Sequence, residues 1–323
     1  MAKAFNYGGQ AVVEGVMMRG RRAAAVAVRR TSGEIVVLEE ALASKLYTHR
    51  IAQLPFMRGL VLLWDMLILG TRMMMFAASV SMEEPAEGAT AAQDTARADE
   101  KPAVVEASAA EVAQARGAGI GLTLLISLAF AIALFFLLPL GIVGLARPLL
   151  GGGWLSLLAE GLIRLALLVA YLAAVGRLQG ISRVFEYHGA EHKTINTYEA
   201  GLPLDVEHVC QASRVHTRCG TGFLLIVVIV SIIVFAFVGA PSLPVRILSR
   251  IVLVPFIASI AYELMRLGAA YYRHRVVRWL MAPSLALQGL TTREPDDRQI
   301  ECAIVALERV LRRDGAPDLV RVA

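Results

Sequence analysis

The chain has 323 residues, of which 57% are hydrophobic and 18% are charged, and its formal net charge is +5. A mean hydropathy of +0.60 excludes an ordinary soluble enzyme and indicates a membrane protein. The modest positive charge suits an anionic membrane surface, so membrane lipid is the expected partner, and the lack of a basic stripe interleaved with aromatic residues argues against nucleic acid.

Residues 1–80 are predicted to form an N-terminal cytoplasmic unit that contains a β-hairpin. Two runs rich in valine and alanine, Ala23 to Arg30 and Glu34 to Glu40, are separated by Thr31-Ser32-Gly33, which is typical of a hairpin turn. Upstream, the paired Gly8-Gly9 indicates a turn or a close backbone approach. This unit is also where a protein partner could bind.

The stretch from Gln53 to Val80 is apolar but carries Arg58, Asp65 and Arg72 at seven-residue spacing. This spacing places the three charges on one stripe of a helix. Because charges in the middle of a membrane are costly, we interpret the stretch as an amphipathic helix that lies on the membrane or packs on the N-terminal unit. A spanning helix is the weaker alternative.

Residues 81–116 differ in composition, because they are rich in alanine and carry many acidic but few basic side chains. Such a segment buries too little apolar surface to offset its loss of conformational entropy. We therefore expect a disordered linker that lets the N-terminal unit move relative to the membrane helices.

Residues 117–323 are predicted to form a membrane domain. Four apolar runs approach the length of about 20 residues that crosses the hydrocarbon core: Gly119 to Ile142, Trp154 to Gly176, Gly222 to Gly239 and Ile247 to Met265. The two short loops between these runs carry one arginine each, whereas residues 177–221 carry five basic side chains. By the positive-inside bias, both termini and this central loop face the cytoplasm, which predicts a multipass protein of a bacterial cytoplasmic membrane.

The C-terminal region is expected to return to water. A short apolar segment, Val276 to Leu287, suits the membrane interface. The segment from Leu290 to Asp297 then has threonines before a proline and acidic residues, which is a helix-start signal. The residues that follow form one apolar face of a helix: Ile300, Ile304, Leu307 and Leu311. The predicted fold class is mainly α and integral to the membrane, with about four transmembrane helices, a small N-terminal β-containing cytoplasmic unit and a C-terminal amphipathic helix.

The main functional signal is the stretch from Tyr187 to Glu199. In a helix, His188 and His192 are spaced i, i+4 on one face, and Glu191 lies beside them. His-x-x-Glu-His is the inverted zincin pattern, in which two imidazoles hold zinc and the glutamate polarises the attacking water. The alternative is a helix end whose polar side chains are solvated.

The predicted topology brings more ligand-type side chains to the same membrane level. His188, His192, His216 and Cys219 together would make a tetrahedral nitrogen and sulfur set for a divalent metal, with zinc expected. Four protein ligands would imply a closed structural site, whereas three with an open position would imply catalysis. Cys219 could instead be a small buried thiol at a helix start.

Three carboxylates are additional candidate ligands. Glu199 shares the helical face of the two histidines, Glu263 ends the fourth apolar run on the cytoplasmic side, and Glu14 stands in the N-terminal unit. For Glu14, a solvated carboxylate in a strand or loop is the favoured interpretation. Within the second apolar run, Glu160 and Arg164 are spaced i, i+4, where a mutual ion pair satisfies both.

Four segments together resemble the bacterial YqhQ family of multipass membrane proteins, which are described as predicted metal-dependent enzymes. They are Gly8 to Gly20, Phe185 to Glu199, His216 to Gly222 and Leu290 to Asp297, so the resemblance extends over nearly the whole chain. The resemblance implies that five positions belong to the family's motifs: His188, Glu191, His192, His216 and Cys219. It implies no particular reaction or substrate. In relatives, the segment that begins at His216 reads His-Pro-Arg-Cys-Gly-Thr. Here Thr217 replaces the proline, so we expect a looser turn between His216 and Cys219.

The leading hypothesis is a metal-dependent enzyme at the cytoplasmic membrane face that performs hydrolysis, with Glu191 as general base or acid. A second hypothesis is a non-enzymatic scaffold, in which the metal only clamps the second and third membrane helices and the N-terminal unit binds a partner. A transporter is the third, and it is disfavoured because the sequence has no internal repeat and no Gly/Pro-broken helix pair around a midplane charge.

Overall fold

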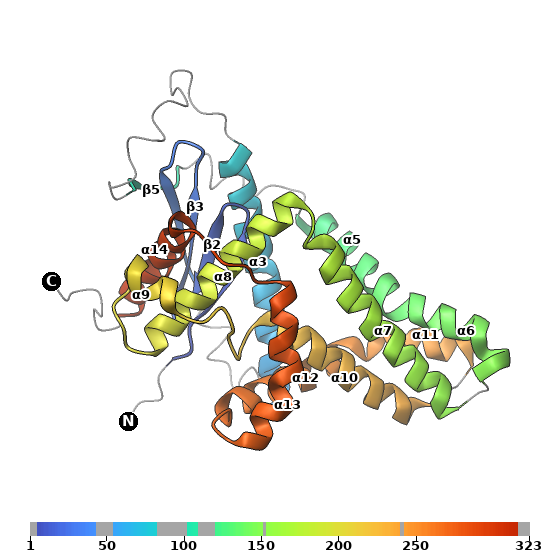
Figure 1. Ribbon diagram of the computed structural model, residues 1–323. Helices are drawn as coiled ribbons and strands as arrows, with labels where there is room; N and C mark the ends of the chain where they lie inside the picture. The colour runs from blue at the N-terminus through green and yellow to red at the C-terminus, as the bar shows by residue number, and fades with distance from the viewer. Residues whose placement is uncertain are drawn as a thin grey trace.

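A computed structural model describes residues 5–42, 54–82, 102–108, 120–150, 153–239 and 242–315. Figure 1 shows a sheet with helices packed on it and, beside it, a bundle of longer helices. The protein is therefore mainly α, with an N-terminal β-sheet, as the sequence predicts.

Five strands form one sheet in the order β1-β2-β3-β4-β5. An antiparallel meander joins β1 (Gly8–Val12), β2 (Gly15–Arg19), β3 (Ala23–Arg29) and β4 (Ile35–Ala41), so the expected hairpin is present as β3 and β4. The short β5 (Val104–Glu106) pairs parallel to β4.

Strand β5 lies inside the segment 81–116, which we expected to be a disordered linker. Its backbone pairs with β4, with Ile35 opposite Val104, and this pairing orders residues 102–108. Residues 81–82 are the end of the preceding helix, and the rest of the expected linker lies outside the described residues.

Both faces of the sheet are covered, because alternate residues of a strand point to opposite sides. On one face, side chains such as Val16 and Met18 pack against α8 (Gln179–Glu199) and α14 (Asp297–Asp314). On the other face, Met17 and its neighbours pack against α3 (Met57–Met82). Segments from the beginning, the middle and the end of the chain thus form one unit, which we call the sheet unit: β1–β5, α3, α8 and α14.

The α14 helix confirms the predicted C-terminal element. Asp296 and Gln299 form a reciprocal capping box at its start, and Gly315 ends it in the left-handed conformation. The predicted apolar face is buried against the sheet: Ile300, Ile304, Leu307 and Leu311. The small α9 (Val206–Gln211) packs on α8 and α14 at the edge of this unit.

Four helices are long and apolar enough to cross a membrane: Met57–Met82, Gly121–Ala146, Trp154–Val175 and Gly220–Val238. The second comprises α5 (Ile120–Ile132), the π-helical η2 (Ala133–Leu137) and most of α6 (Leu138–Leu150); the last two are α7 and α10. This set differs from the predicted one, because it contains α3 in place of the fourth apolar run.

The predicted fourth run, Ile247 to Met265, is broken. It is divided between α11 (Leu243–Val252) and α12 (Val254–Ala270), which are bent by 45° relative to each other and can count together as a further span. Pro255 lies in the first turn of α12, where its missing N–H removes a helical hydrogen bond to the residues before it. The prediction of one continuous run from Ile247 to Met265 is therefore wrong.

The α3 helix bears out the interpretation that it packs on the N-terminal unit, since its C-terminal half covers the sheet. Each charge of its stripe is paired with another element: Arg58 with Glu263 of α12, Asp65 with Arg19 at 3.3 Å, and Arg72 with Glu40 at 2.7 Å. The seven-residue spacing thus marks the side of α3 that faces protein.

The chain then returns along the bundle through α13 (Arg275–Leu287) and the 3-10 turn η3 (Gln288–Leu290) to α14. Val276, Trp279 and Leu280 of α13 expose 69%, 76% and 64% of their surface. Such an exposed apolar side, next to Arg275 and Arg278, is what a helix at a membrane interface presents.

Candidate metal centre

Two glycines let the other segments of the site approach α8. A Cβ at Gly9 of β1 would lie 2.8 Å from Cγ of Glu191, and a Cβ at Gly189 would lie 2.0 Å from the carbonyl oxygen of Arg293. Both contacts are far shorter than van der Waals distance, so only glycine permits them. The close backbone approach expected at Gly8-Gly9 is therefore present at Gly9, whereas a Cβ at Gly8 would meet nothing within 4 Å.

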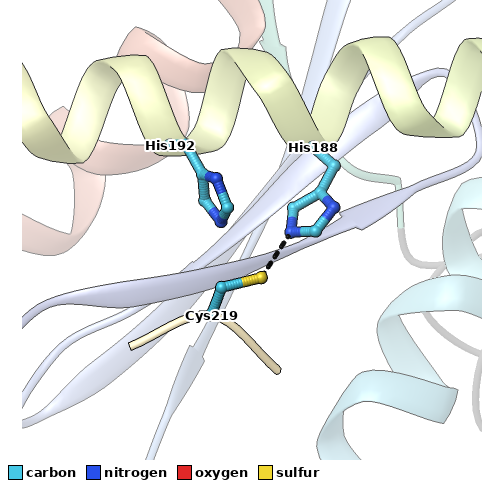
Figure 2. Close-up of side chains that lie close together, drawn as sticks. All are labelled: His188, His192 and Cys219. Atoms are coloured by element: carbon cyan, nitrogen blue, oxygen red, sulfur yellow. Dashed lines mark hydrogen bonds between the residues drawn. The ribbon is translucent and has the colours of Figure 1, made fainter. Parts of the chain in front are cut away.

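Three ligand-type side chains converge below α8: His188, His192 and Cys219 (Figure 2). One ligand atom from each lies within 4.8 Å of the other two. The Sγ atom of Cys219 is 3.3 Å from Nε2 of His188. Zinc bonds of about 2.3 Å to sulfur and about 2.0 Å to nitrogen, in a tetrahedron, separate the two ligand atoms by about 3.5 Å, so the spacing fits such an ion.

Both imidazoles are oriented by backbone carbonyls. Nδ1 of His188 lies 2.8 Å from the carbonyl oxygen of Thr291, and Nδ1 of His192 lies 2.5 Å from that of Arg214. A carbonyl can only accept a hydrogen bond, so each Nδ1 carries the proton and, in a neutral ring, Nε2 keeps its lone pair. Histidines that bind metals are usually held in this way.

Cys219 is the residue that caps the start of α10. The backbone N–H of Thr221 donates to its Sγ at 3.4 Å, and the N-terminal end of a helix favours negative charge. The thiol is buried, with 5% of the residue exposed. The N–H donor and the helix start therefore make Cys219 a suitable metal ligand, whereas Cys302 is fully buried in the apolar core of the sheet unit.

Glu191 lies against the same two imidazoles. Its Oε2 is 3.6 Å from Nε2 of His192 and 3.9 Å from Nε2 of His188, and the residue is 4% exposed. It is not among the three residues whose ligand atoms all approach within 4.8 Å. Its carboxylate therefore stands beside the candidate ligands rather than among them, as the His-x-x-Glu-His pattern predicts for a proton acceptor.

His216 is not brought into the three-membered group. Its ring centroid is 5.6 Å from that of His192, and its Nε2 is 3.6 Å from Oε2 of Glu199. Within the described part of the chain, this buried Nε2 has no hydrogen-bond partner. The structure thus brings together three members of the predicted set of four and places His216 next to them.

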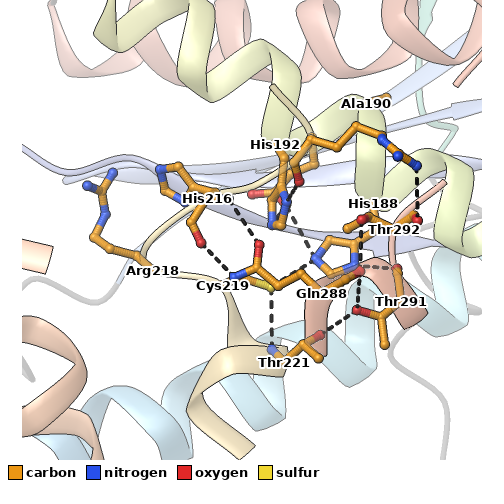
Figure 3. Close-up of polar contacts among 12 residues, drawn as sticks. His188, Ala190, His192, His216, Arg218, Cys219, Thr221, Gln288, Thr291 and Thr292 are labelled. Atoms are coloured by element: carbon orange, nitrogen blue, oxygen red, sulfur yellow. Dashed lines mark hydrogen bonds and ion pairs between the residues drawn. The ribbon is translucent and has the colours of Figure 1, made fainter. Parts of the chain in front are cut away.

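The turn that carries His216 and Cys219 is held by Gln288. Its amide donates to the carbonyl of His216 at 2.8 Å and accepts from the N–H of His216 at 3.0 Å (Figure 3). The N–H of Cys219 closes the turn by donating to the His216 carbonyl at 3.4 Å. A side-chain clamp from η3 thus fixes a turn that we expected to be looser because Thr217 replaces a proline.

The three additional carboxylates are engaged by arginines. Both oxygens of Glu14 accept from Arg183, both oxygens of Glu263 accept from Arg58, and Glu199 pairs with Arg218. Glu14 adopts a positive φ of 52° in the β1–β2 turn. None of the three belongs to the three-membered group.

Glu199 is the acidic neighbour of His216. Burial acts to raise the pKa of Glu199, but its neighbours His216 and Arg218 outweigh burial and hold the pKa below its ordinary value. Glu199 is therefore a carboxylate at neutral pH, and its Oε2 lies 3.6 Å from Nε2 of His216.

Residues that support the site were missed in the sequence. Thr291 and Arg214 contribute backbone carbonyls, which carry no residue-specific signal, and the hydroxyls of Thr221 and Thr291 lie 2.9 Å apart. From its residues alone, Leu290 to Asp297 predicts only a helix start. Its resemblance to a family segment was the one sign that it did more.

Comparison with known proteins identifies the family. The family described as "Protein of unknown function (DUF1385)" matches residues 54–313. The chain belongs to this family. It is also 33% identical over 317 residues to "Uncharacterized protein YqhQ" of Bacillus subtilis (strain 168), across 96% of the chain and 93% of that protein. The resemblance to the YqhQ family is thus confirmed, and no solved structure matches.

Proposed function

We propose that the protein is a membrane enzyme that uses a divalent metal, zinc in the first place, for hydrolysis. The observation that carries this proposal is the convergence of His188, His192 and Cys219 within 4.8 Å. The donor set of two imidazoles and one thiol suits zinc. Both Nδ1 atoms are occupied by carbonyls, so both Nε2 atoms remain for coordination.

The division of roles follows from the geometry. His188, His192 and Cys219 would hold the zinc ion, which would act as a Lewis acid at neutral pH. Glu191, next to both Nε2 atoms, is placed to accept a proton from the attacking water and to return it to the leaving group. His192 is 1% exposed, whereas the side chain of His188 is 17% exposed, so substrate would enter from the His188 side.

We infer that the site lies at the cytoplasmic face of a bacterial membrane, with both termini on that side. The basic residues of 177–218 support this orientation by the positive-inside bias. The exposed apolar side of α13 supports a nearby interface, because α13 is followed directly by Gln288, which holds the turn of His216. Membrane lipid would then border the site.

A structural metal is the second candidate function, and one observation favours it. The three ligands join α8, which packs on the sheet, to the residue that caps the start of α10 in the bundle. A metal there could clamp the two parts without any reaction, as structural sites do. The protein would then be a scaffold whose sheet unit binds a partner.

The substitution Glu191→Gln separates the two candidates. It keeps the size of the side chain but removes the proton acceptor, and a general base contributes about 10²- to 10⁴-fold to rate. We expect this variant to be produced at the wild-type level and to retain its metal. In a strain that lacks the gene, it should fail to correct the defect that the deletion causes.

Two further variants make the result interpretable. His188→Ala should also fail, and it should lose metal. His208→Ala is the matched control, because His208 is half exposed and pairs with Asp205 away from the site, and it should restore function. If Glu191→Gln restores function fully while His188→Ala fails, the structural candidate replaces the enzyme.

A further inference from the structure

An exposed surface that is both apolar and basic lies where the chain turns from α12 into α13. On α13, Val276, Trp279 and Leu280 expose 69%, 76% and 64% of their surface. Their spacing of three and four residues places them on one side of the helix. Figure 1 shows this turn at the lower edge of the molecule, away from the sheet. We call this surface, together with the adjacent Arg275 and Arg278, the α13 face.

The charge beside this apolar side is entirely positive. Arg275 and Arg278 are exposed, and so is Arg273 in the turn before them. Within the described part of the chain, none of these three side chains forms an ion pair or a hydrogen bond. Residues 264–293 contain five arginines and no Asp or Glu. This stretch therefore offers no acid that could neutralise them.

The opposite side of α13 packs into the bundle, so the exposed side is held outward. Met281, Ser284 and Leu287 are buried there. A Cβ at Gly222, in the first turn of α10, would lie 2.4 Å from Oγ of Ser284. A Cβ at Gly268 of α12 would lie 2.6 Å from Sδ of Met281. Because α13 fits this closely against two helices, it cannot rotate to bury its apolar side.

Length and charge limit what can cover the α13 face. The 13 residues of α13 extend about 20 Å, which is too short for the roughly 30 Å of a hydrocarbon core. A second copy of the chain is disfavoured, because a two-fold contact would bring the same arginines of both copies together without an acid. A helix with an apolar side and arginines beside it suits a membrane interface, where the arginines lie at the level of the headgroups.

We propose that the α13 face docks on anionic phospholipids. Arg275 and Arg278 bind the phosphates, because guanidinium groups form paired, charge-assisted hydrogen bonds with them. Val276, Trp279 and Leu280 enter the boundary of the acyl chains, where the amphipathic ring of tryptophan is favoured. The proposal rests on the interfacial position proposed above for α13, but it requires neither a bound metal nor a reaction.

The test identifies the lipid that surrounds Trp279. Trp64→Phe and Trp154→Phe leave Trp279 as the only tryptophan of the full-length chain, and both replaced side chains are exposed. This protein is reconstituted in bilayers of equal amounts of phosphatidylglycerol and phosphatidylcholine, with bromine on the acyl chains of one of the two lipids. Bromine quenches tryptophan fluorescence on contact. We expect both brominated lipids to quench Trp279, and phosphatidylglycerol to quench it more strongly.

Two double variants test the role of the arginines. Arg275→Gln with Arg278→Gln should leave Trp279 quenched but lower the preference for phosphatidylglycerol, by about fivefold for each cation removed from an anionic surface. Arg298→Gln with Arg312→Gln is the matched control, because it removes two exposed arginines from α14 in the sheet unit. This control should keep the preference of the parent protein.

Two kinds of result would overturn the proposal. If neither brominated lipid quenches Trp279 in protein that is folded by circular dichroism, another protein surface covers the α13 face, and a crosslink between two chains at this face would identify a second copy. If both lipids quench it equally, or if the folded Arg275→Gln, Arg278→Gln variant keeps the full preference, the face does not select anionic phospholipid. Neither result would bear on the metal centre, which metal content tests separately.

Discussion

His216 and Cys219 stand on a turn whose position is set by one side chain from another element. Gln288 satisfies both polar groups of the His216 peptide, and it is 1% exposed. Because Cys219 comes three residues later, a shift of the turn would move its Sγ away from His188. The geometry of the candidate ligands therefore depends on a residue that touches none of their ligand atoms.

Gln288→Ala should weaken metal binding although every ligand is retained. We expect the zinc affinity, measured by competition with a chromophoric chelator, to fall about 10- to 100-fold, as is typical when a residue that orients a ligand is removed. Gln179→Ala is the control, because Gln179 is exposed at the start of α8. An unchanged zinc affinity in folded Gln288→Ala would show that the turn holds without this clamp.

At this scale, the sequence predicted which residue types meet but not how each is held. The i, i+4 spacing of His188 and His192, with Glu191 between them, was sufficient to place them together. The distance between Cys219 and His188 depends on how α10 meets α8, and His216 is directed toward Glu199 by a turn of only a few residues. Such orientations depend on tertiary packing, which a linear spacing does not encode.

The α8 helix links the two parts of the molecule, since it leaves the bundle after α7 and packs on β1 and α14. Its glycines differ in what surrounds them. A Cβ at Gly189 would lie 2.0 Å from the Arg293 carbonyl, whereas a Cβ at Gly180 would meet nothing within 4 Å. Gly189 permits the close contact with Arg293, and this contact also brings the nearby Thr291 carbonyl to His188.

Alanine at these two positions should act in opposite directions. Within a helix, Gly→Ala alone stabilises by about 0.5–1 kcal/mol, so Gly180→Ala should raise the thermal midpoint slightly. Gly189→Ala should lower it, because overpacking typically costs about 1–3 kcal/mol. Midpoints from circular dichroism in detergent check this, and a stabilised Gly189→Ala variant would contradict the close contact.

Element boundaries were predicted well where the sequence carries local signals. The capping residues of α14 and the turn of the β3–β4 hairpin are such signals, and both elements are present. The break between α11 and α12 was missed, because the apolar run continues through Pro255. Strand β5 was missed because only its pairing with β4, far away in the sequence, makes it a strand.

The packing of the sheet unit limits how the chain can be threaded through a membrane. The first strands, α8 and α14 share one apolar core, so they lie on one side. An even number of crossings must therefore separate them. If the apolar helices cross a membrane, the α5–η2–α6 run with α7 would supply two crossings, and α10 with the bent α11–α12 pair would supply two more.

The same reasoning bears on α3, which is apolar enough to cross. Strand β4 before it and β5 after it are hydrogen-bonded, so both lie on one side of a membrane. If α3 crossed the membrane, a second crossing between α3 and β5 would have to bring the chain back. Residues 83–101 between them contain six acidic side chains, which are costly inside a membrane. We therefore expect four crossings without α3.

Cysteine labelling from outside intact cells tests this orientation. Cys210, between α8 and α10, is exposed, whereas Cys219 and Cys302 are buried. We expect an impermeant maleimide to leave Cys210 unlabelled until the cells are permeabilised. Ser242 lies at the start of α11. A Ser242→Cys variant that also carries Cys210→Ser should be labelled in intact cells. The reverse pattern would place the sheet unit and the candidate metal centre outside.

The most direct test of the central claim is the metal content of the protein, purified without chelators and measured by inductively coupled plasma mass spectrometry. We predict about one zinc ion per chain, by the three-ligand geometry, and its loss in His188→Ala, His192→Ala and Cys219→Ser. His208→Ala should retain it. Wild-type protein that contains no stoichiometric divalent metal and takes up none on dialysis against zinc would contradict the proposed metal centre.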